Sequence, residues 1–149
     1  MTRADCGEVF EPLKAAVDPT YLFSHVDAAR AFADEALDLK RPDFVQALKI
    51  KGVLKERVDF RLLLQALDCD RACRDEVLFY LSRVSVHELE GQVIEFINIE
   101  LERDGEPDAA IYWMIRALVC MNTKTARFFL DGLRNHPKIR GDEVLAALV

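Results

Sequence analysis

Three neighbouring residues, Tyr112, Trp113 and Arg116, are the side chains in this sequence best suited to binding another molecule. They lie in the run from Asp108 to Met121, where Arg116 is the only residue after Asp108 that is not apolar. In a helix these three side chains share one sector with Cys120. Tyrosine, tryptophan and arginine are enriched at protein interface hot spots, so the sector predicts an anchor for a partner. The structural alternative is an arginine whose stem packs while its guanidinium reaches water or a carboxylate.

A second candidate surface is the acidic edge formed by Glu88, Glu95 and Glu102, which share one side of the helix expected between residues 85 and 103. Residues 84–110 carry eight acidic groups and one basic group, whereas residues 40–61 carry three acidic and seven basic groups. Such an edge can steer a basic partner by its field. The alternative is an ordinary solvated helix face, because charge runs usually serve solubility.

The motifs that would indicate catalysis or a cofactor are absent from the sequence. The six glycines form neither a dinucleotide-binding fingerprint nor a phosphate-binding loop. His87 and Glu88 begin a zinc-protease pattern, but Gly91 stands where the second histidine is required. Cys69 and Cys73 could share a helix face, yet a zinc site needs about four ligands. We therefore expect no metal and no cofactor, while an enzyme without a short motif stays an alternative.

The composition is that of an ordinary globular chain. With 149 residues, 51% hydrophobic and 31% charged, the sequence predicts a single domain spanning residues 1–149. The net charge of −6 argues against nucleic-acid binding, since phosphate neutralisation needs a basic surface. No segment predicts a leader peptide or a membrane span, and the four cysteines (Cys6, Cys69, Cys73 and Cys120) form no CxxC pair. A cytoplasmic protein with reduced thiols is expected.

Apolar residues recur at helical spacing almost throughout the chain, which predicts an all-α fold of about eight helices. The helical segments are expected near residues 9–17, 27–39, 42–53, 58–67, 70–81, 85–103, 108–121, 123–133 and 142–148, with Tyr21 to Phe23 as a link. Ser85 and Glu88 have capping-box spacing. Asp108, either Asp68 or Asp70, and either Asn122 or Thr123 are the further expected N-caps.

A weak internal repeat suggests how these helices stack. A shift of 34 positions superposes residues 77–84 (VLFYLSRV) on residues 111–118 (IYWMIRAL), and a shift of 33 superposes residues 95–97 on residues 128–130. Repeats of this length are typical of helical solenoids. The sequence thus predicts helical hairpins stacked as a short HEAT-like solenoid, with a compact bundle as the alternative.

The leading functional hypothesis is a non-enzymatic protein-binding module of the adaptor, chaperone-like or toxin-immunity type. In this hypothesis Tyr112, Trp113 and Arg116 anchor a partner protein, and Glu88, Glu95 and Glu102 attract its basic surface. The alternative is an enzyme or a small-ligand-binding protein with a pocket between helices near Tyr112, Trp113 and Arg116. A deep closed pocket at this place would favour the alternative, and an open groove would favour a protein partner.

Overall fold

The computed structural model describes residues 9–149, so Cys6 lies outside the described residues. Across residues 9–149 the chain forms eleven α-helices, one short 3-10 helix and no strand, which confirms the all-α class. It divides into two compact units, one ending at Leu54 and one running from Lys55 to Val149. The single domain stays a prediction. No helix among residues 9–149 is both long enough and apolar enough to cross a membrane.

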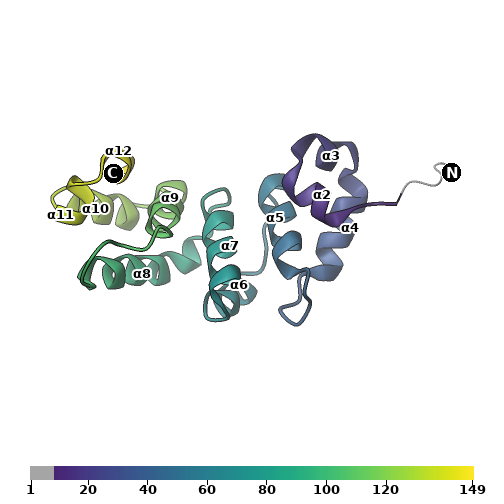
Figure 1. The fold of residues 1–149 in the computed structure, drawn as a ribbon, viewed down its shortest axis with the longest axis horizontal. Coiled ribbons are helices and arrows are strands. Elements are labelled where there is room, and N and C mark those ends of the chain that lie inside the picture. Colours follow the sequence, from purple (N-terminus) through teal and green to yellow (C-terminus); the bar gives the residue numbers. More distant parts are fainter. Residues whose placement is uncertain (1–8) are drawn as a thin grey trace. The chain divides into compact units, whose positions relative to one another are not determined.

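The first unit is built from four helices (Figure 1), which pack around a core of small side chains. They are α2 (Pro12–Val17), α3 (Pro19–Ser24), α4 (Val26–Ala36) and α5 (Phe44–Leu54). Helices α4 and α5 pack together, and α2 packs against α5. Six of the eight core residues are alanines, which let helix backbones approach closely, and aromatic Phe10, Tyr21 and Phe32 seal the edges of this core.

The second unit consists of helical hairpins that stack through their second helices. Its elements are α6 (Phe60–Leu67), α7 (Arg71–Leu81), η1 (His87–Leu89), α8 (Glu90–Glu102), α9 (Ile111–Met121), α10 (Lys124–Leu133), α11 (Pro137–Arg140) and α12 (Glu143–Leu148). Helix α6 pairs with α7, and α8 with α9 (Figure 1). Helix α7 then packs on α9, and α9 packs on α12, so α7, α9 and α12 form one row.

The internal repeat corresponds to this stacking. Residues 77–84 begin within α7 and residues 111–118 within α9, the second helices of successive hairpins. Equivalent positions have equivalent burial: Leu81 and Ile115 are both fully buried, whereas Ser82 and Arg116 are both half-buried. The same holds for Ile97 of α8 and Leu130 of α10 in the second superposition. The helices of the second unit are therefore arranged as stacked hairpins.

Helix boundaries show where local signals were misread. Two short helices, α3 and α11, lie outside the predicted segments, and each begins at a proline, Pro19 and Pro137 respectively. Proline also suits the first turn of a new helix. The side chain of Asp18 accepts hydrogen bonds from the amides of Thr20 and Tyr21. His136 caps α11 in the same way, through the amide of Lys138.

The predicted capping box at Ser85 and Glu88 is wrong. Neither side chain caps a helix: the chain passes through η1 before α8 begins at Glu90, and no side chain caps α8. The Glu88 carboxylate instead lies 3.5 Å from the guanidinium of Arg57, which also donates to the backbone carbonyl of Ser85 at 3.1 Å. A long-range ion pair has replaced a local cap.

The other N-cap predictions fared better. Asp70 caps α7 by accepting from the amide of Cys73, and Thr123 caps α10 by accepting from that of Ala126. Asp108 stands two residues before the N-cap position of α9, which Ala110 occupies, although its carboxylate still accepts from the Ala110 amide at 2.9 Å. The central helix consequently begins later than expected, at Ile111.

Candidate functional site

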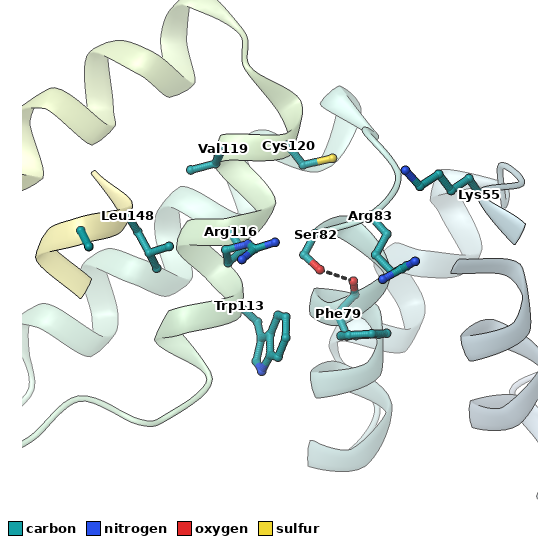
Figure 2. A pocket seen from close by; sticks show the side chains of 10 residues that line it. Lys55, Phe79, Ser82, Arg83, Trp113, Arg116, Val119, Cys120 and Leu148 are labelled. Atoms are coloured by element: carbon teal, nitrogen blue, oxygen red, sulfur yellow. Dashed lines mark hydrogen bonds between the residues drawn. The ribbon is translucent and has the colours of Figure 1, made fainter. Parts of the chain in front are cut away.

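The main cavity of the second unit lies along the row of α7, α9 and α12 and is open to solvent. It has a volume of about 680 Å³, and we call it the central groove. In Figure 2, Trp113 and Arg116 extend from α9 toward the residues of α7. The lining residues are Lys55, Phe79, Ser82, Arg83, Trp113, Arg116, Val119, Cys120, Ala147 and Leu148.

An aromatic pair forms the apolar part of the central groove. The rings of Phe79 and Trp113 meet edge to face, with centroids 5.1 Å apart and an interplanar angle of 77°. Tyr112 supports Trp113 from within α9 by a second edge-to-face contact, with centroids 4.9 Å apart. Such geometry adds to the stabilisation from burial and restricts the indole to one orientation. Trp113 is therefore a preorganised contact surface.

Three basic side chains form the polar part of the central groove. Arg116 lies with its guanidinium carbon 5.8 Å from the Tyr112 ring centroid and donates to the Tyr112 hydroxyl at 3.3 Å. Arg83 lies in the same way over Phe79, also at 5.8 Å. Lys55 completes the set, and the described residues that line the central groove include no carboxylate and no histidine. The charge of the groove is thus opposite to that of the whole chain, which is −6.

Two lining groups could act as nucleophiles, Ser82 and Cys120. The Ser82 hydroxyl donates to the carbonyl of Phe79 at 2.5 Å, which is a local bond within α7 (Figure 2). Burial raises the pKa of the Cys120 thiol, although the positive charges of Lys55 and Arg116 oppose this effect. The reactive form of cysteine is the thiolate. Because the described lining residues include no histidine and no carboxylate, neither group has a neighbouring base of these kinds to activate it for attack.

The groove residues follow the 34-residue period of the helices. Phe79, Trp113 and Ala147 stand at intervals of 34 residues and all line the central groove. Ser82 and Arg116 are a second pair with the same spacing. Each helix in the row presents the same face to the groove, so the groove is a property of the repeat and not of one loop.

The structure brings together part of the predicted binding set. Trp113 and Arg116 line the central groove, while Tyr112 touches both and itself lines a smaller cavity of about 180 Å³ next to α12. The acidic edge lies apart, because none of its three glutamates lines the groove. Glu88 is bound to Arg57, and Glu95 and Glu102 are exposed on α8.

Sequence reasoning missed Lys55, Phe79 and Arg83. A signal for the last two was present, since the segment containing Phe79 and Arg83 superposes on the one containing Trp113 and Arg116. Phe79 and Trp113 occupy equivalent positions of the repeat, so a binding role for Trp113 predicts one for Phe79. Lys55 gave no such signal, because it lies between helices with a positive φ of 56°.

One group of potential metal ligands lies at the start of α7. Ligand atoms of Cys69, Asp70 and Cys73 all lie within 4.8 Å of one another. The Asp70 carboxylate already accepts from the amide of Cys73 at 2.8 Å. Burial, with the neighbouring carboxylate, raises the pKa of the Cys73 thiol to about 11. A thiol must lose its proton to bind metal, so Cys73 is a poor ligand, and the group offers three ligands where a zinc site takes about four.

Comparison with known proteins identifies no relative. No protein-family model, no curated protein and no solved structure matches this chain.

Proposed function

We propose that this chain is a non-enzymatic helical module that binds another protein through the central groove. The observation that carries the proposal is the position of Trp113 and Arg116, which lie together in an open groove along the repeated face of three helices. Rigid aromatic and arginine side chains anchor protein interfaces because they bury much surface for little loss of freedom. An adaptor, a chaperone-like protein or an immunity protein in the cytoplasm would use such a surface.

A binding role suits the groove better than catalysis. General acid or base catalysis needs a histidine, a carboxylate or another group that exchanges protons near neutral pH. The lining residues of the groove include two arginines, a lysine and a thiol whose pKa is raised by burial. Such a set suits the holding of a ligand better than the transfer of its protons.

The acidic edge has a separate part in this proposal. Glu95 and Glu102 are exposed on α8, and neither contacts a basic group among residues 9–149. Exposed carboxylates act through a field that salt screens within about 8 Å, so they affect encounter more than lifetime. We propose that they attract a basic region of the partner while the groove holds another part of it.

The test begins with capture of partners from the host by the intact chain, identified by mass spectrometry. Surface plasmon resonance then compares the parent with Trp113→Ala. Loss of the anchor should weaken binding by about 2 kcal/mol or more, mainly through faster dissociation. Phe128→Ala is the matched control, because Phe128 is 82% exposed and lies outside the groove. Equal binding by the parent and a well-folded Trp113→Ala variant would place the interface elsewhere.

The acidic edge is tested on the same partner with Glu95→Lys and Glu102→Lys combined. We expect slower association at low salt, little change in dissociation, and convergence with the parent at high salt. An unchanged association rate at low salt would show that α8 presents only a solvated face.

A second candidate function is binding of a small ligand. The volume of about 680 Å³ lies within the range of roughly 300 to 1,000 Å³ that ligand pockets occupy. Mass spectrometry of the intact chain under non-denaturing conditions would reveal a co-purified metabolite. A stoichiometric small molecule that Trp113→Ala releases would favour this candidate over the protein partner.

A further inference from the structure

The central groove is positively charged in a chain that is acidic overall. Lys55, Arg83 and Arg116 line it without a carboxylate among the lining residues, and the net charge of the chain is −6. For Arg116, the only bonded partner among residues 9–149 is the hydroxyl of Tyr112. A surface of this kind favours a ligand with negative charge, because unlike charges complement each other and like charges repel at an interface.

The geometry of the Arg83 and Arg116 guanidiniums indicates which anionic group the ligand carries. Each lies near an aromatic ring, Arg83 by Phe79 and Arg116 by Tyr112, at 5.8 Å. A guanidinium held in this way keeps a defined plane, and its fork of N–H donors matches the two oxygens of a carboxylate. Between them, Phe79 and Trp113 offer an apolar contact surface. The groove thus combines carboxylate recognition with a place for one apolar side chain.

The repetition of the groove distinguishes an extended ligand from a compact one. Phe79, Trp113 and Ala147 occupy equivalent positions on three successive helices of the row. Equivalent positions at regular spacing suit a chain that itself repeats, such as a peptide in extended conformation. Val119, which is 43% exposed, and Leu148 continue the apolar surface beyond Trp113.

We propose that the central groove binds an acidic linear segment of a partner protein, with an apolar side chain on Phe79 and Trp113 and flanking carboxylates on Arg83 and Arg116. This inference rests on the proposed protein-binding function and specifies the part of the partner that enters the groove. Single-stranded nucleic acid also uses aromatic and basic side chains. The acidity of the chain as a whole disfavours it, since phosphate binding needs a basic surface.

The test uses a synthetic peptide library, selected on the immobilised full chain. Each short peptide has one central phenylalanine, flanked by positions that vary among glutamate, glutamine, lysine and serine. We expect glutamate to be enriched around the phenylalanine. Selected peptides are then titrated while the fluorescence of Trp113 is recorded, because Trp113 is the single tryptophan and lines the groove. A saturable change in its emission places the peptide at the groove.

Variants decide whether the basic residues of the groove bind the carboxylates. Arg83→Glu and Arg116→Gln should each weaken the selected peptide about tenfold, and replacing its glutamates by glutamine should have a similar effect. Arg140→Glu is the matched control, since Arg140 is exposed on α11 and lies outside the groove; it should change affinity by less than about twofold. Exposed Arg83 keeps the test valid if Arg116→Gln fails to fold.

The outcomes that overturn the inference differ from those that overturn the proposed function. Enrichment of lysine, or tight binding of oligothymidylate that displaces the peptide from Trp113, would show that the groove does not select acidic segments. Absence of any enrichment would do the same. The protein-binding function would survive each result if a captured partner still depended on Trp113. The protein-binding function itself would be contradicted if Trp113→Ala left binding of the captured partner unchanged.

Discussion

Tyr80 shows how one buried side chain connects two parts of the second unit. Its hydroxyl accepts a hydrogen bond from the amide of Val58 at 2.9 Å and donates to the carbonyl of Glu56 at 2.6 Å, while the side chain is 0% exposed. Tyr80→Phe leaves the Val58 amide without its partner and should lower the free energy of unfolding by about 1 to 3 kcal/mol in urea. Tyr112→Phe, at a half-buried tyrosine, should cost less than about 0.5 kcal/mol. Equal losses of unfolding free energy in the two variants would show that the Tyr80 hydroxyl makes no special contribution to stability.

Asp108 makes stability depend on acid pH. The amide of Ala110 holds its pKa below the ordinary value of 3.8, with a further contribution from Arg71, whose guanidinium lies 2.6 Å away. A lowered pKa means that the ionised form stabilises the fold above pH 3.8 and that this contribution is lost as pH falls further. Asp108→Asn should therefore unfold about 1 to 2 kcal/mol more easily at neutral pH, as measured in urea.

The pH dependence of this difference is the sharper measurement. Parent and Asp108→Asn should converge in stability as the pH falls well below 3.8, because the parent carboxylate becomes protonated there. Asp104→Asn is the matched control, because Asp104 is exposed and has no charged partner among residues 9–149. A gap between parent and Asp108→Asn that persists unchanged in acid would mean that the amide side chain disturbs packing instead.

At the scale of elements, α9 is the helix on which the second unit is assembled. It contacts α7, α8, α10 and α12, and both Ile115 and Leu118 are 0% exposed. Ile115→Ala or Leu118→Ala should each reduce the free energy of unfolding by about 2 to 5 kcal/mol, because truncation leaves a cavity among packed helices. Glu95→Ala, on the exposed side of α8, should stay within about 0.5 kcal/mol. Small, equal effects of all three in denaturant titrations would show that α9 is not central.

At the scale of the molecule, the second unit contains its own hydrophobic core and every residue of the central groove. A fragment comprising residues 55–149 should therefore fold by itself, with helical far-ultraviolet circular dichroism and a cooperative thermal transition. It should also retain binding to any partner that depends on Trp113. A fragment without cooperative melting would show that the two units fold only as one domain.

Local sequence patterns were sufficient to determine the class of fold and several of the buried positions. The 3.6-residue period is a property of each segment alone, so the buried positions Ile97, Ile115 and Leu118 could be assigned from it. The N-caps Asp70 and Thr123 could be predicted in the same way, because each side chain bonds to an amide only three residues further along the chain. The predicted capping box is wrong because the Glu88 carboxylate pairs with a distant residue, Arg57, which local spacing does not reveal.

Only the tertiary structure decided the composition of the central groove. Sequence placed Trp113 and Arg116 on one side of a helix, but it could not show that α7 and α12 pack beside them. Helix packing places Phe79 and Arg83 beside Trp113, and the glutamates of the acidic edge do not line the groove. The surface around Trp113 is therefore basic, whereas the sequence predicted acidic residues beside it. The 3.6-residue period determines which side chains of one helix share a face. Which other helices pack beside that face depends on how the helices stack.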